Sequence, residues 1–145
     1  MSSRSKSRKH AVDAVYGGLV RESSIAAQFD DNIHGAKLSN NPWFGYAREI
    51  AYGVSDTVEE LDETIDASSK NWSVQRMPRI DLAILRVASW EILFNKDVPD
   101  AVAISEAMQL ADELSTEESA KFIAGVLSRV QATKGDDTNL RNQVG

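Results

Sequence analysis

The stretch that decides the fold runs from Ile80 to Phe94 and reads IDLAILRVASWEILF. A helix that is apolar on nearly all sides is buried on nearly all sides. We therefore expect this helix at the centre of the molecule, with Trp90 and Leu93 in the core and other helices packed around it. Only four of its residues are polar: Asp81, Arg86, Ser89 and Glu91.

The segments on both sides of this stretch have the apolar spacing of amphipathic helices. A short helix is expected around Ile25–Phe29, and a break near Gly53–Ser55 is expected before a capping-box pattern that begins at Thr57. No useful length of chain alternates with the period of a strand. The apolar stripes run over residues 12–20, 44–65, 102–114 and 122–130.

The sequence therefore predicts an all-α fold of about seven helices with short connections. Its 145 residues suit one domain, which we place at 1–134, with the basic arm at about 1–10. Residues 135–145 are polar and are expected to form a disordered tail.

Composition excludes most catalytic chemistry. The chain has no cysteine, and its two histidines, His10 and His34, have no acidic or histidine neighbour at ligand spacing. No glycine-rich phosphate loop is present. We therefore expect neither an enzyme nor a metal or cofactor site.

No apolar run has the length of a membrane span and no signal peptide is recognisable, so a soluble, cytoplasmic protein without membrane contact is expected.

The chain begins with a basic arm, SRSKSRKH, from Ser3 to His10. Since the whole chain carries 16 basic and 22 acidic residues, for a net charge of −6, this arm would attract a polyanion while the rest of the surface repels it. A solubilising tail without a partner explains the charge equally well. The four cations of the arm are Arg4, Lys6, Arg8 and Lys9.

Three segments together resemble the NusB family of bacterial transcription antitermination factors. They are RKHAVDAVY (8–16), MPRIDLAILRVASWEILF (77–94) and DVPDAVAISEAMQLADELSTEESAKFIAGVL (97–127). The resemblance implies two packed three-helix bundles with a short extra helix. It also implies binding to the boxA element of nascent ribosomal RNA leaders, alone or with the ribosomal protein NusE. Such binding helps the RNA polymerase antitermination complex to read through terminators in rRNA operons.

The resemblance also suggests which residues bind. Asp81 and Glu91, charges on a mostly buried helix, are expected to face the basic ribosomal partner; an internal pair of Asp81 with Arg79 or Arg86 is the alternative. Phe122 is expected to be structural, and Ser105 and Ala124 replace family asparagines. The residues expected to bind RNA are Arg4, Lys6, Arg8, Lys9, Tyr16 and Lys121.

Two other functions stay open at this point. A helical scaffold for protein–protein interaction would have the same helices without specific RNA binding. A fragment of an rRNA cytosine methyltransferase would have a similar helical domain, but no residues remain for a cofactor-binding sheet. Relatives of this family include monomers and dimers, so a homodimer also stays open.

Overall fold

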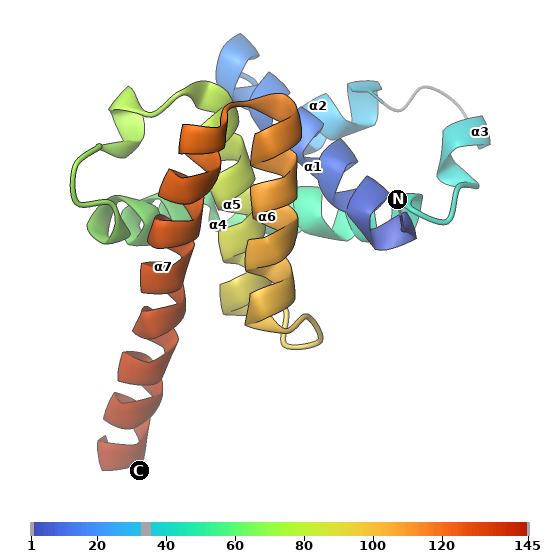
Figure 1. Cartoon of the computed structure of the whole chain (residues 1–145). Helices are drawn as coiled ribbons and strands as arrows, with labels where there is room; N and C mark the ends of the chain where they lie inside the picture. The colour runs from blue at the N-terminus through green and yellow to red at the C-terminus, as the bar shows by residue number, and fades with distance from the viewer. Residues whose placement is uncertain (1, 33–35, 145) are drawn as a thin grey trace.

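The computed structural model describes the backbone of residues 2–32 and 36–144, and the side chains of 2–32 and 38–134. Within these residues every regular element is helical, as the sequence predicts (Figure 1). The elements are α1 (Ser3–Arg21), α2 (Ile25–Asn32), α3 (Ala36–Ser39), α4 (Phe44–Ser68), a 3-10 helix (Val74–Arg76), α5 (Arg79–Phe94), α6 (Asp100–Leu114) and α7 (Glu117–Val144). Within the described part of the chain, no helix is long and apolar enough to cross a membrane.

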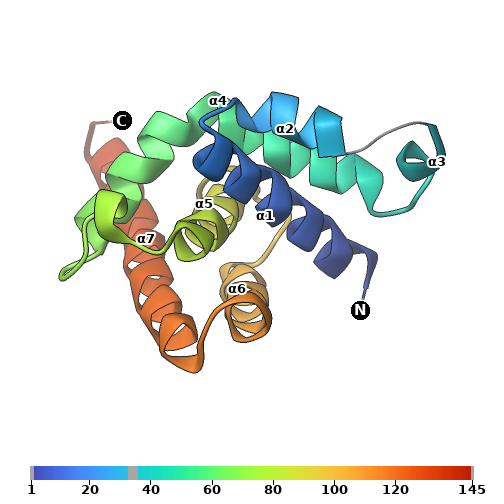
Figure 2. The same cartoon turned by 90° about the horizontal axis from the view of Figure 1, so that it is seen from above.

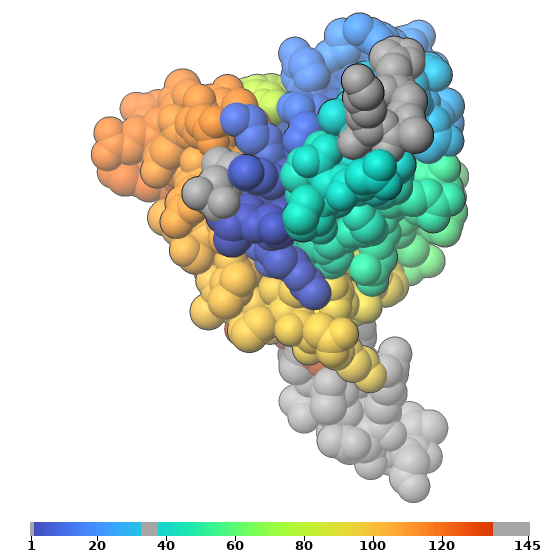
Figure 3. All heavy atoms as spheres, turned by 90° about the vertical axis from the view of Figure 1, so that its right-hand side faces the viewer, coloured from blue at the N-terminus to red at the C-terminus, as the bar shows by residue number. Residues whose placement is uncertain are grey.

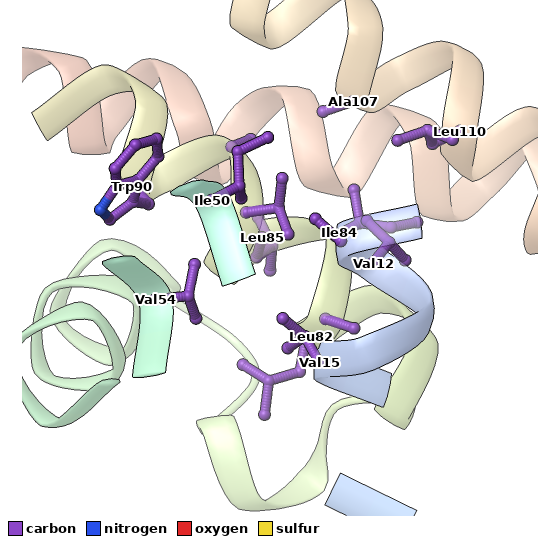
Figure 4. Close-up of a cluster of buried hydrophobic side chains, with 14 of the residues drawn as sticks. Val12, Val15, Ile50, Val54, Leu82, Ile84, Leu85, Trp90, Ala107 and Leu110 are labelled. Carbon is purple, nitrogen blue, oxygen red and sulfur yellow. The ribbon is translucent and has the colours of Figure 1, made fainter. Parts of the chain in front are cut away.

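The apolar helix α5 lies at the centre, which confirms the expectation from its sequence. It packs against α1, α4, α6 and α7, and every residue from 81 to 92 is buried. Figure 4 shows its side chains Leu82, Ile84 and Leu85 among residues from the surrounding helices. Trp90 is buried, whereas Leu93 is only partly buried because α5 ends one residue later.

The helices form two groups of three, the arrangement that the resemblance implies. Helices α1, α2 and α4 contact one another, and so do α5, α6 and α7. The groups join where α5 packs against α1 and α4. Seen from above, α1 crosses α4 on one side of α5, and α6 and α7 lie on the other (Figure 2).

Helix α4 is bent at the place where the sequence predicts a break. The backbone leaves the helical conformation at Thr57, with φ −122° and ψ 17°. The Thr57 hydroxyl does not cap a new helix but donates to the Gly53 carbonyl at 2.7 Å, a bond that commonly bends helices. A Cβ atom on Gly53 would lie 2.3 Å from Nε1 of Trp90, so α5 approaches the backbone of α4 directly at the bend.

Helix α7 continues beyond Lys134 to Val144, into the stretch that the sequence predicts to be a disordered tail. The side chains of 135–145 lie outside the described residues.

Candidate nucleic-acid interface

The basic arm is folded as the first two turns of α1. The Ser2 hydroxyl caps the helix by accepting a bond from the Ser5 backbone N–H at 3.1 Å. No acidic residue lies in the first turn of α1. Cations at the positive end of a helix dipole are unfavourable, so this arm needs anions from other elements. Figure 3 shows the arm in a seam between α6 and the start of α4.

A buried ion pair fixes the arm to the central helix. Arg8 is 4% exposed, and its Nε lies 2.9 and 3.0 Å from the two carboxylate oxygens of Glu91, which is 1% exposed. Glu106 of α6 lies 3.6 Å from another nitrogen of Arg8. Burial alone would lower the pKa of Arg8, but the hydrogen bond and negative charge of Glu91 outweigh it and raise the pKa.

This pair corrects two expectations from the sequence. Arg8 was expected to contact RNA and Glu91 to contact a protein partner, but each is buried against the other. A charge on a helix inside the molecule needs an internal counter-ion, and here the arm itself supplies it. Arg8 therefore anchors the arm to α5, and Glu91 does not lie on a surface that a partner could contact.

Tyr46 connects the buried pair to the surface. From α4, its hydroxyl donates to Glu91 and accepts a bond from the Asn95 side chain at 3.1 Å. Burial, together with the hydrogen bond to Glu91, raises the pKa of Tyr46. The guanidinium of Arg4 lies 4.0 Å from the centre of the Tyr46 ring, at cation–π distance. Arg4 is therefore exposed but held in place.

Acidic residues of α6 line one side of the arm. The Ser5 hydroxyl donates to Glu106 at 2.8 Å, and Lys9 Nζ lies 2.5 Å from a carboxylate oxygen of Glu113. The hydrogen bond that Lys9 donates to Glu113 raises the pKa of Lys9. Lys6 is exposed and takes part in none of the salt bridges found among the described side chains.

Trp43 anchors the other side of the arm. Its ring stacks on His10 with 3.7 Å between centroids and 10° between planes, and its carbonyl accepts a bond from the Ser7 hydroxyl at 2.7 Å. Burial lowers the pKa of His10, so the neutral ring is favoured in this position. The arm is therefore held by α4, α5 and α6 together.

The other residues expected to bind RNA lie on the surface. Tyr16, on the third turn beyond Lys6, is 39% exposed and is not a core aromatic. Lys121 is exposed near the start of α7. Phe122 is partly buried against the core, in agreement with a structural role.

Asp81 does not lie on a partner face. It is fully buried in the first turn of α5 and accepts a bond from the Ser119 hydroxyl at 2.8 Å. The alternative of a pair with Arg79 or Arg86 is also not observed. Arg79 donates to backbone carbonyls, the nearest at 2.7 Å, and Arg86 pairs with Asp62 at 2.6 Å. Asp81 therefore joins the starts of α5 and α7 and is unavailable to a partner.

Sequence reasoning missed Tyr46, Glu106 and Glu113. The two glutamates are seven residues apart in α6, so they share a helix face, and this spacing is the signal that could have indicated an acidic stripe. Nothing near Tyr46 in the sequence indicates that it meets Arg4. Among the described residues, no group of histidine and acidic side chains could hold a metal ion.

These features define a class: an all-α protein of two helical bundles with a folded, cation-bearing first helix. Residues 5–132 match the model of the NusB family. The transcription antitermination protein NusB of Clavibacter sepedonicus is 47% identical over 92% of this chain and 99% of its own length. That of Leifsonia xyli subsp. xyli (strain CTCB07) is 44% identical over 94% of this chain and 96% of its own length. The chain therefore belongs to the NusB family of transcription antitermination proteins, which is not a family of enzymes.

Solved structures have the same fold. The NusB structure from T. maritima has a TM-score of 0.80 and 27% identity, over 89% of this chain and 90% of that one. A chain in the crystal structure of antitermination factors NusB and NusE in complex with dsRNA has a TM-score of 0.78 over 92% of this chain and 98% of that one. Its identity is 22%.

Proposed function

We propose that this protein binds the boxA element of nascent ribosomal RNA leaders in the bacterial cytoplasm, together with the ribosomal protein NusE. In this role it helps RNA polymerase to read through terminators in rRNA operons. The observation that carries the proposal is the arm: it is folded, positive and exposed at Arg4 and Lys6, on a body that is otherwise acidic.

The charge distribution favours local binding of a polyanion. Removing the four arm cations from the 16 basic residues leaves 12 against 22 acidic ones, so the rest of the chain carries −10. RNA phosphates are attracted to the arm, while the net negative charge of the rest of the chain limits unspecific binding. Lys9 is partly exposed, and it can contact RNA only if phosphate replaces Glu113 as its partner.

Two observations support the proposal that NusE is the protein partner. One of the solved structures with this fold contains NusB, NusE and dsRNA. An acidic surface also suits a basic ribosomal protein, since complementary charge speeds association and excludes wrong partners. The buried positions of Asp81 and Glu91 leave the contact residues on this chain unassigned.

The proposal is tested by titrating boxA RNA and a scrambled RNA of equal length into the protein, with and without NusE. We expect boxA to bind more tightly than the scrambled RNA. The double variant Arg4→Ala/Lys6→Ala should weaken both, because phosphate contacts position RNA without reading its sequence. The control Arg21→Ala/Arg48→Ala removes two exposed cations outside the arm and should leave both affinities nearly unchanged. Equal affinity for the two RNAs, unaffected by the arm variant, would favour the protein–protein scaffold.

A further inference from the structure

The loop between α4 and α5, residues 69–78, displays an aromatic side chain. Trp72 is 41% exposed, whereas the other two tryptophans, Trp43 and Trp90, are 8% and 7% exposed. Exposing a tryptophan costs the stabilisation that its burial would give. Its position on the surface therefore needs an explanation.

The loop holds Trp72 in a fixed place. The Ser69 hydroxyl donates to the Trp72 carbonyl at 2.6 Å, and the Val74 N–H donates to Asp66 at 3.0 Å. The Arg79 side chain donates to the carbonyls of Val74 and Gln75 at 2.8 and 3.0 Å. Because both sides of the loop are hydrogen-bonded, the exposure of Trp72 comes from the fold and not from a loose segment.

Trp72 is part of a cluster that joins the loop to α7. Its ring meets Phe122 edge to face, with 5.3 Å between centroids and 89° between planes. Three exposed cations flank this ring pair along the chain: Lys70 and Arg76 lie in the same loop as Trp72, and Lys121 precedes Phe122. None of the three belongs to a salt bridge among the described side chains, unlike Arg8, Lys9 and Arg86. We call Lys70, Trp72, Arg76, Lys121 and Phe122 the loop platform.

The chemistry of the loop platform fits a single-stranded nucleic acid. Non-specific binders of single strands combine cations for the phosphates with aromatic rings on which bases stack. A rigid, exposed ring loses little conformational entropy when a base stacks on it. An apolar protein partner would leave three unpaired cations at the edge of its interface, which is unfavourable unless it supplies acids.

We propose that the loop platform is a second RNA contact, where a base of the bound strand stacks on Trp72 while Lys70, Arg76 and Lys121 contact phosphates. The proposal rests on the RNA-binding function proposed above and extends it beyond the arm. Seen from above, the arm, the end of α6, the start of α7 and the α4–α5 loop follow one another around one side of the molecule (Figure 2). A strand that leaves the arm along this side would reach the α4–α5 loop, which carries Trp72.

Tryptophan fluorescence of the full-length protein tests the proposal directly, with boxA RNA as the probe in the presence of saturating NusE. We expect RNA to quench the emission of the wild type, because Trp72 is the exposed tryptophan. Trp72→Phe should lose most of the quenching but keep most of the affinity, since a phenyl ring still stacks. Trp72→Ala should weaken RNA binding between about 5-fold and 150-fold, the effect of one lost base stack.

Two controls separate stacking from charge and from general loss of aromatic surface. Trp72→Ala should leave the salt dependence of binding unchanged, whereas Lys121→Ala should make the log–log slope shallower by about 0.7. Phe94→Ala removes an aromatic ring that is 43% exposed at the far end of α5, and it should have no effect on RNA affinity.

The outcomes distinguish this proposal from the one on which it rests. If Trp72→Ala binds RNA like the wild type while the arm variant Arg4→Ala/Lys6→Ala is impaired, the loop platform is not an RNA contact and the proposed function stands. If Trp72→Ala weakens only the association with NusE, the loop is a protein surface. If the wild type does not bind boxA RNA at all, both proposals fail.

Discussion

At the scale of single residues, the same type of side chain has two different roles in the arm. Arg4 and Arg8 are one helical turn apart, and no feature of the sequence distinguishes their roles. The structure buries Arg8 against Glu91 and leaves Arg4 outside on the ring of Tyr46. One arginine therefore fixes the arm, and the other stays exposed on the surface.

This division predicts unequal effects on stability. Glu91→Ala leaves the Arg8 guanidinium buried without a partner, so we expect the free energy of unfolding to fall by about 3–5 kcal/mol. Glu113→Ala removes the partner of the exposed Lys9 and should leave the midpoint of urea unfolding almost unchanged. Equal shifts of the two midpoints would mean that the Arg8–Glu91 pair is not the anchor.

The partners of single charged residues are also what the sequence could not predict. Periodicity identified α5 as the buried helix because the apolar pattern covers all of its sides. The same pattern could not say where the few charges on α5 point. The partner of Glu91 is 83 residues away in the sequence, and that of Asp81 is 38 residues away. Such pairings depend on how the helices pack, so the arm was predicted but its anchor was not.

At the scale of elements, the bend in α4 brings α5 against its backbone. The sequence predicted an interruption near this place from Gly53–Ser55 and the pattern at Thr57. It could not predict that Gly53 is needed because the Trp90 ring occupies the position of its missing side chain. This contact connects the two groups of helices.

Two glycines of α4 test this contact. We predict that Gly53→Ala destabilises the protein by about 1–3 kcal/mol, because a methyl group would overlap the Trp90 ring. Gly45→Ala has open space around the new methyl group and should be neutral or stabilising by up to about 1 kcal/mol. Thermal unfolding of the two variants measures both changes. If Gly53→Ala were as stable as Gly45→Ala, the close packing of α5 on α4 would be contradicted.

The side of α6 that faces the arm is a second feature at this scale. Glu113 pairs with Lys9, so under the proposed function it would compete with an RNA phosphate for this cation. We predict that Glu113→Gln tightens RNA binding severalfold at low salt and less at high salt, because exposed charges are screened. Asp112→Asn makes the same charge change one residue away without releasing a cation of the arm, and it should have a smaller effect. If the two variants had equal effects in a binding titration, the cause would be the removal of one negative charge and not the release of Lys9.

At the scale of the whole molecule, the charges form two regions. The acidic body and the basic arm have opposite signs, and the folded arm lies between α4 and α6 (Figure 3). A rigid arm loses less conformational entropy on binding than a disordered one. We propose that this arm neutralises RNA phosphates through Arg4, Lys6 and Lys9, and that the buried Arg8 does not take part.

The salt dependence of boxA RNA binding measures how many phosphates the arm neutralises. Each cation that neutralises a phosphate of a single strand contributes about −0.7 to the log–log slope. Replacing Arg4, Lys6 and Lys9 with alanine should therefore make the slope shallower by about 2, with little change in melting temperature. A triple variant that binds RNA with the slope of the wild type would show instead that Arg4, Lys6 and Lys9 contact no phosphate.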